Sequence, residues 1–211
     1  MPHSQRPWRS PVPCSIGSHC TSDRTLADAR LAAVSRISAP VQRVIDAAAR
    51  KGVQLEIRHF DQTTHTAADA AAAVGAEVGQ IVKSLVFVSE GANGPRPCLV
   101  LASGANLVDI GLLAAMLTEP RVRRATADEA RELTGFAIGG IPPFGHTQSL
   151  RTLMDPDLGR YEQVWAAAGT PNAVFAVAPA TLRALSNATV TPIALVRQSP
   201  TEQQAASATS A

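Results

Sequence analysis

The residues best suited to chemistry form a glycine- and proline-rich stretch in the second half of the chain. In the segment FAIGGIPPFGHTQ, Gly139, Gly140 and Gly145 surround Pro142 and Pro143. Glycine lets a backbone approach a ligand closely with exposed N–H groups, and proline stiffens the loop so that those groups stay aimed. The combination suits a cradle for an oxyanion or a phosphate, and an ordinary tight turn between strands is the alternative.

Other chemical motifs are weak. The loop is not followed by the GK[ST] of a Walker loop, and the chain lacks the GxGxxG of dinucleotide-binding proteins. Ser103 lies in ASGAN, which is not a G-x-S-x-G nucleophile elbow. His59, His65 and His146 are far apart in sequence and form no metal-binding motif. We therefore expect no metal and no cofactor, and a hydrolase built on this chain would act on a bond that is already labile.

A single lysine is the second candidate for chemistry. The chain has 19 Lys and Arg residues, of which only Lys51 and Lys83 are lysines. Lys83 lies in IVKSL, where its neighbours on a strand are apolar. Such a lysine either points out of the sheet into water along its aliphatic stem or projects into a cleft. The pattern leaves both interpretations open.

Composition limits the class of protein. The chain has 211 residues, 45% of them hydrophobic, which suffices for one sizeable core. Its net charge of +2 is too small for nonspecific binding of long nucleic acids, so we expect no DNA partner and only small, local RNA contacts. No apolar run reaches about 18 residues, the length of a membrane helix, and residues 1–25 lack the apolar stretch of a secretory signal, so we expect neither. We expect a cytoplasmic protein without membrane contact.

Three regions follow from composition along the chain. Residues 1–35 are rich in Pro and Ser and are expected to be an appended, disordered leader. Residues 198–211 are small and polar, and are expected to be a disordered tail. The folded unit is therefore predicted to span residues 36–197.

Capping signals predict the helices that position these residues. Thr66 can cap a helix over 67–74, and Gly75 follows it where a left-handed residue is favoured. Asp109 can cap a helix over 110–117, and Thr126 one over 127–134. Pro179 suits the first turn of a short helix over 179–186.

Strand signals alternate with these helices. Residues 54–60 alternate in polarity, and 80–90 and 96–103 read as a hairpin joined by GANGP. Residues 172–178 and 190–196 are two later candidates. The elements show no regular βαβ repeat. The predicted fold class is α+β, a single domain with a mixed, curved, barrel-like sheet surrounded by helices.

Four linked segments carry a resemblance to a known family. THTAADAAAAVGAEVGQIVKSLVF, SGANLVD, RELTGFAIGGIPPFGH and WAAAGTPNAVF occur in this order. In residue types and spacing they resemble the YbaK/EbsC family, free-standing relatives of the editing domain inserted in bacterial prolyl-tRNA synthetases. The resemblance implies an enzyme that hydrolyses mischarged aminoacyl-tRNA in trans and contacts its acceptor end. It also makes a synthetase such as prolyl-tRNA synthetase a candidate partner.

The resemblance also assigns roles to residues. It implies that Lys83 occupies the place of the family's essential lysine and that Gly139 to Pro143 form its G-x-x-x-P substrate loop. Lys83 would hold the terminal phosphate or stabilise the developing oxyanion, and both roles stay open. The candidates for substrate binding are Thr66, Gly139, Gly140, Pro143, His146 and Gly169.

One departure concerns the amino acid removed. Members that remove cysteine carry Ser in the segment that aligns with Ala167 to Gly169, and here the aligned position is Ala167. A small amino acid such as Ser, Thr or Ala is therefore expected rather than Cys. A pocket lined by Ala and Gly separates a methyl from a hydroxymethyl group only weakly. The alternative function is a non-catalytic module that binds aminoacyl-tRNA or a synthetase.

Overall fold

The computed structural model describes residues 37–60, 66–91 and 94–195. The predicted leader and tail lie outside the described residues. None of the helices in these ranges is long and apolar enough to cross a membrane. The described α-helices are α2 (Ala39–Ala49), α3 (Ala67–Val74), α4 (Ile110–Leu117), α5 (Ala127–Thr134) and α6 (Pro179–Ser186). Two short 3-10 helices are η1 (Val78–Gln80) and η2 (Pro156–Arg160).

The strands form two sheets. The five-stranded sheet has the order β4 (Val122–Arg124), β2 (Val82–Gly91), β3 (Gly94–Ser103), β5 (Arg151–Met154) and β8 (Thr189–Val190). The three-stranded sheet has the order β1 (Ile57–His59), β7 (Ala173–Val177) and β6 (Val164–Ala167). β2 pairs antiparallel with β3, whereas β3 and β5 run parallel. The mixed α+β class is confirmed.

The barrel-like curvature is not confirmed. Within the described ranges the strands form two separate sheets and no closed barrel. A single bridge between Ile81 and Trp165 connects the start of β2 to β6. The two sheets share the main core, and the bridge between them lies beside the site described below.

The predicted caps are confirmed. The Thr66 hydroxyl accepts a hydrogen bond from the Asp69 N–H at 3.1 Å, which satisfies a helix donor that would otherwise lack a partner. Asp109 and Thr126 cap α4 and α5 in the same way. Gly75 ends α3 with φ of 71°, a conformation that glycine adopts without steric cost. These local signals fix where α3, α4 and α5 begin.

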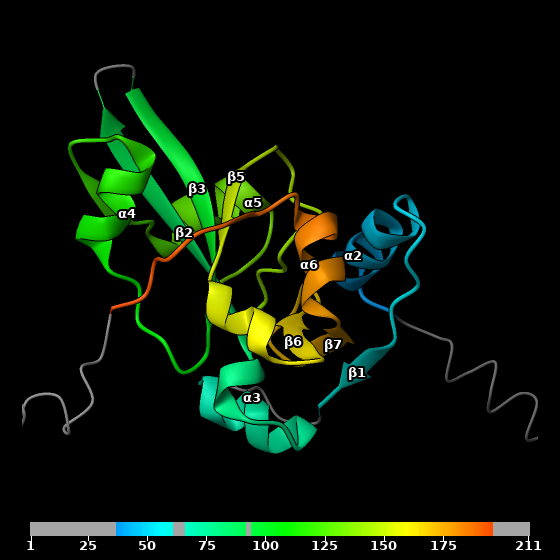
Figure 1. The fold of residues 1–211 in the computed structure, drawn as a ribbon. Helices are drawn as coiled ribbons and strands as arrows, with labels where there is room; N and C mark the ends of the chain where they lie inside the picture. Colours follow the sequence, from blue (N-terminus) through cyan, green and yellow to red (C-terminus); the bar gives the residue numbers. More distant parts are fainter. Residues whose placement is uncertain (1–36, 61–65, 92–93, 196–211) are drawn as a thin grey trace, which may run out of the picture. The chain divides into compact units, whose positions relative to one another are not determined.

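Alternation along β2 divides its side chains between two cores. Val82 and Val86 belong to the large core shared with β6, β7, α2 and α6. Phe87 belongs to a second core with α4, which Figure 1 shows beside β2 and β3. Because successive residues of a strand point to opposite faces, Lys83 and Ser84 lie on different sides of the sheet. The alternation therefore determines whether the side chain of Lys83 or that of Ser84 points toward the cavity described below.

Two predicted strands are shorter than expected. Of residues 190–196, Val190 alone belongs to a named strand, β8. Pro192 has no N–H to donate to a ladder, so the pairing with β5 ends before it, and after it Ala194 forms only an isolated bridge with Val108. Of residues 54–60, only Ile57–His59 pair, with β7. Strands β4, β5 and β6 were not predicted from the sequence.

Candidate active site

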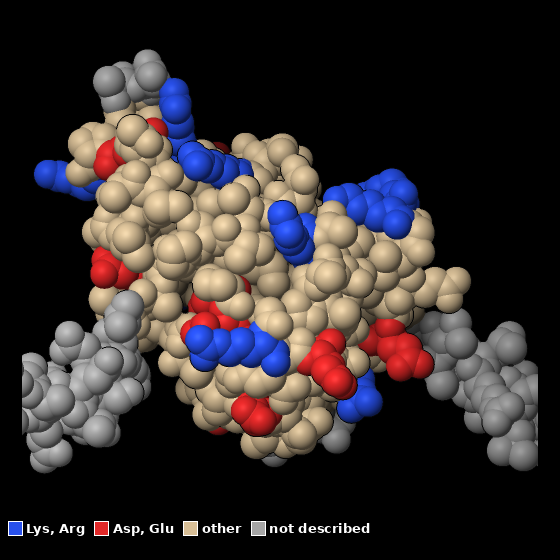
Figure 2. Space-filling view, viewed as in Figure 1, with Lys and Arg blue, Asp and Glu red and all other residues tan. Residues whose placement is uncertain are grey.

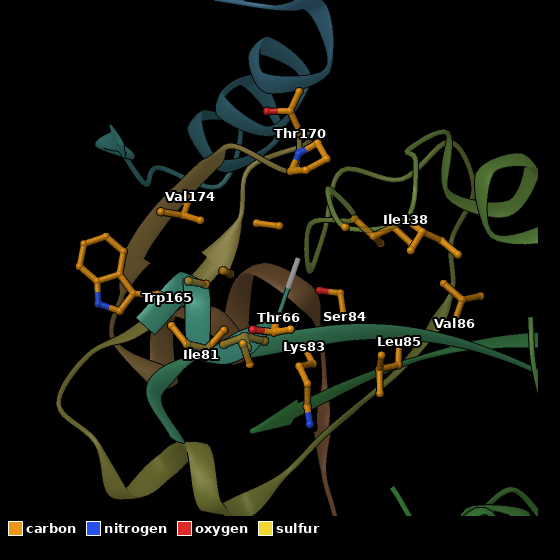
Figure 3. A pocket seen from close by; sticks show the side chains of 18 of the residues that line it. Thr66, Ile81, Lys83, Ser84, Leu85, Val86, Ile138, Trp165, Thr170 and Val174 are labelled. Carbon is orange, nitrogen blue, oxygen red and sulfur yellow. The ribbon is translucent and has the colours of Figure 1, made fainter. Parts of the chain in front are cut away.

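A cavity of about 260 Å³ lies where α3, β2, the loop after α5 and the β6–β7 hairpin meet (Figure 3). Small and branched apolar side chains make up most of its wall, and a few polar residues interrupt them. The polar residues are Thr66, Lys83, Ser84, Arg124 and Thr170. The apolar ones include Ala67, Ala70, Ile81, Val82, Val86, Ile141, Ala166, Ala167 and Val174. The cavity therefore suits a small, mostly apolar group.

The structure brings only some of the predicted site residues to this cavity. Thr66, Lys83 and Gly139 line it. The remaining candidates do not line it: Gly140, His146 and Gly169 support the loops that form it, as described next, and Pro143 is buried within the glycine loop.

The glycine loop packs closely against the turn between β6 and β7. Gly139 has φ of 88°, which favours glycine. The Gly140 N–H donates to the Ala137 carbonyl at 3.0 Å, so it closes a turn and is not directed at a ligand. A Cβ on Gly140 would lie 2.7–2.9 Å from backbone atoms of Thr170. The close approach of two backbones is thus the physical reason for glycine at this position.

Two amides of this loop remain available. Gly139 and Ile141 both line the cavity. Neither N–H donates a hydrogen bond within the described ranges. Unpaired backbone N–H groups beside a cavity can stabilise a carbonyl oxygen that gains negative charge. Of the amides in this loop, those of Gly139 and Ile141 could therefore form the predicted cradle, whereas the Gly140 N–H is already bonded to Ala137.

His146 and Gly169 support the loop from behind. The His146 Nε2–H donates to the Pro142 carbonyl at 2.8 Å, and the ring packs edge-on against Phe136. Burial lowers the pKa of His146, so the ring is neutral near pH 7. Gly169 has φ of 102°, and a Cβ there would lie 2.8 Å from the Pro40 carbonyl. Both residues position backbone rather than contact the cavity.

Lys83 is held by the turn that follows β3. Its ammonium donates to the carbonyls of Gly104, at 3.2 Å, and of Asn106. The Asn106 side chain in turn donates to Asp155 and Asp157, at 2.8 Å each. Figure 3 shows the Lys83 ammonium on the side of β2 away from Ser84. Lys83 thus lines the cavity, and its ammonium is bonded to the turn that Asn106 connects to Asp155 and Asp157.

Comparison with known protein families identifies the segment that contains α3, β2 with Lys83, and the glycine loop. A model of the aminoacyl-tRNA editing domain matches residues 61–185. The chain belongs to the aminoacyl-tRNA editing domain family. The matched range contains α3, Lys83 and the glycine loop, so the resemblance found in the sequence is confirmed. Members of this family are trans-editing deacylases that act in the proofreading of translation.

Three relatives illustrate the relationship. A crystal structure of a candidate trans-editing enzyme for prolyl tRNA synthetase is 46% identical, with a TM-score of 0.69 over 76% of this chain and 99% of that one. The multifunctional Ser/Thr-tRNA deacylase ProXp-y of Escherichia coli (strain K12) is 29% identical over 58% of this chain and 74% of its own. The uncharacterized protein YwhH of Bacillus subtilis (strain 168) is 28% identical over 62% and 81%.

The arginines near this editing domain's cavity differ in their partners. Arg123 forms ion pairs with Glu129 at 2.7 Å and with Glu90 at 2.9 Å, and Arg121 pairs with Glu90 at 3.8 Å. The bond from Arg123 lowers the pKa of Glu129 to about 2. Arg124 is exposed, lines the cavity and forms no ion pair within the described ranges. Of these three described arginines, Arg124 is therefore the one whose charge remains available to a ligand.

Ser84 is a polar residue of the editing cavity that was not predicted from the sequence. Ser84 follows the lysine, lies on the cavity side of β2 and lines the cavity (Figure 3). The alternation of IVKSLVF contained this signal, because it places Ser84 on the face of Val82 and Val86. No group of three or more His, Cys, Asp or Glu side chains in the described residues could hold a metal ion.

Proposed function

We propose that this protein hydrolyses, in trans, the ester of a tRNA mischarged with Ser, Thr or Ala, in preference to Cys. The observation that carries the proposal is the cavity of about 260 Å³ with its wall of small apolar side chains. Pockets for small molecules usually hold about 300–1,000 Å³, so this one suits a side chain of few atoms. Activity on Ser- and Thr-tRNA in the ProXp-y relative supports the same class.

The chemistry needs little from the protein. An aminoacyl ester is already reactive, so positioning it beside a water molecule and stabilising its oxyanion supply most of the acceleration. The amides of Gly139 and Ile141 can receive the oxyanion, and Thr66 closes the wall from α3. Gly140, His146 and Gly169 hold the two loops in place, and Pro143 is the buried proline that stiffens the glycine loop. Lys83 and Arg124 are the two cationic residues in the lining of the cavity.

Ala167 supports the preference against cysteine. It lies at the end of β6 and lines the cavity, so its methyl group stands where cysteine-removing members are expected to carry a hydroxyl. A wall without that hydroxyl offers a thiol no specific partner at this position. The remaining lining selects mainly by size.

A single-turnover assay tests the proposed activity. The whole chain would be mixed with one tRNA charged with Ser or, as a control of size, with Phe. We expect free Ser to be released at a rate that increases with protein concentration, and Phe to remain attached. Binding of Ser-tRNA without release would instead establish the non-catalytic module, and equal release of both would remove the role of cavity size.

Arg124 is proposed to contact a phosphate of the acceptor end. Arg124→Ala is expected to lower kcat/KM about threefold at low salt, because the substitution removes the exposed guanidinium that would contact the phosphate at the cavity. The dependence of log kcat/KM on log salt should become shallower by about 0.7, the value for one contact to a single strand. Initial rates at several salt concentrations measure both effects.

Arg121→Ala is the matched control, because Arg121 is exposed on the same segment, pairs with Glu90 and does not line the cavity. Equal salt slopes for the two variants would contradict a specific phosphate contact at Arg124. Residual tRNA selectivity in the Arg124 variant would then be assigned to delivery by a partner such as prolyl-tRNA synthetase.

A further inference from the structure

Ser84 gives the cavity a polar group at an otherwise apolar position. On its face of β2 the neighbouring residues are Val82 and Val86, which are buried in the main core. The opposite wall brings Ile141 and Ala166 to the same cavity. A hydroxyl among such neighbours is costly to place there unless something bonds to it.

The Ser84 hydroxyl has no such bond in the protein. Its oxygen is buried and has no hydrogen-bond partner among the described residues. The other two hydroxyls of the cavity wall differ, because Thr66 accepts from the Asp69 N–H and Thr170 donates to the Asn172 side chain. A buried hydroxyl without a partner costs about 1–3 kcal/mol, which a ligand group that bonds to it would offset.

The chemistry of the position restricts that ligand group. A hydroxyl donates one hydrogen bond and accepts others, so it pairs well with a second hydroxyl. The substrate's α-ammonium group would lose its hydration among Val82 and Val86, and one neutral hydroxyl does not compensate for a buried charge. Rotation of Ser84 about its Cα–Cβ bond between staggered positions can aim the oxygen at a group in the cavity.

We propose that Ser84 is a specificity-determining residue that hydrogen-bonds the side-chain hydroxyl of the attached amino acid, so that the protein favours seryl and threonyl esters over alanyl esters. This inference rests on the proposed deacylase function and narrows it. It also revises the expectation from the sequence, in which an Ala- and Gly-lined pocket separates a hydroxymethyl from a methyl group only weakly.

The test compares kcat/KM on one tRNA charged with Ser and with Ala, for the whole chain and for Ser84→Ala. Wild type is expected to favour the seryl ester. Loss of one neutral hydrogen bond should reduce the Ser/Ala ratio of kcat/KM about fivefold in the variant. Ser84→Cys, which keeps the size of the side chain but bonds weakly, should reduce the ratio in the same direction.

Ser89→Ala is the matched control, because Ser89 lies on the same strand about 17 Å away, at about 3.3 Å per residue, and bonds to the Arg96 carbonyl. Its Ser/Ala ratio should equal that of wild type. A ratio in Ser84→Ala within twofold of wild type would overturn the role of Ser84 while leaving the deacylase function intact.

Two further readouts are decisive. If wild type released neither amino acid, the proposed function would fail, and the role of Ser84 with it. Since Ser84→Ala removes a hydroxyl without a protein partner, its melting temperature should be no lower than that of wild type. A fall of several degrees would show that the protein itself uses this hydroxyl, and would overturn the inference.

Discussion

Lys83→Ala should lower kcat/KM for deacylation at least about tenfold while the protein remains folded. A charged hydrogen-bond donor contributes about 1.5–3 kcal/mol, and each 1.4 kcal/mol of transition-state stabilisation is about tenfold in rate. Lys83 lines the cavity, and its ammonium anchors the turn at Gly104 and Asn106. Initial rates on Ser-charged tRNA and a thermal melt of each variant measure the two effects separately.

The chain provides a matched control in Lys51, its other lysine. The Lys51 ammonium also donates to two backbone carbonyls, those of Ala184 at 3.0 Å and Leu185 at 2.7 Å, and it does not line the cavity. Lys51→Ala therefore removes the same kind of structural contact without touching the site. Equal rates for both variants and wild type would contradict a catalytic Lys83, and equal losses of rate in both would make its role structural.

Gly140→Ala should reduce both stability and activity. The added methyl group would overlap the Thr170 backbone, which cannot rotate away as a side chain can. Overpacking of this kind costs about 1–3 kcal/mol of the free energy of unfolding. The loop that carries Gly139 and Ile141 would also shift from the cavity, and a misplacement of about 1 Å can cost up to about a hundredfold in rate. Thermal unfolding and kcat/KM on Ser-charged tRNA give the two values.

Gly159→Ala is the appropriate control for this change. A Cβ at Gly159 would meet no atom within 4 Å, and its φ is not in the left-handed region, so alanine fits there without strain. This variant should retain wild-type activity and stability. Wild-type behaviour of Gly140→Ala as well would mean that the two loops separate easily and do not shape the cavity.

Local chemistry made the helix starts and the long hairpin predictable. A threonine or aspartate cap is specified by residues within one turn, and Thr66, Asp109 and Thr126 behave as their sequence neighbours indicate. The hairpin of β2 and β3 is equally local. The parallel pairing of β3 with β5 joins segments about fifty residues apart, and nothing within either segment specifies the other.

The site was predictable in part for the same reason. The family motif located Thr66, Lys83 and Gly139, and all three line the cavity. The sequence made Gly140 a candidate for substrate binding, whereas the atoms nearest a Cβ there belong to the backbone of Thr170. That contact depends on the tertiary approach of two loops, as does the unpartnered state of the Ser84 hydroxyl.

The most direct test of the central claim compares initial rates on one tRNA charged with Ser, Thr, Ala or Cys, at one salt concentration and with the whole chain. We expect release of Ser and Thr, slower release of Ala, and no preference for Cys. Size alone cannot separate Ser from Cys, so the chemistry of the wall at Ala167 and Ser84 must do so. A rate on the Cys ester about tenfold or more above the rates on the other three esters would contradict the proposed preference against cysteine.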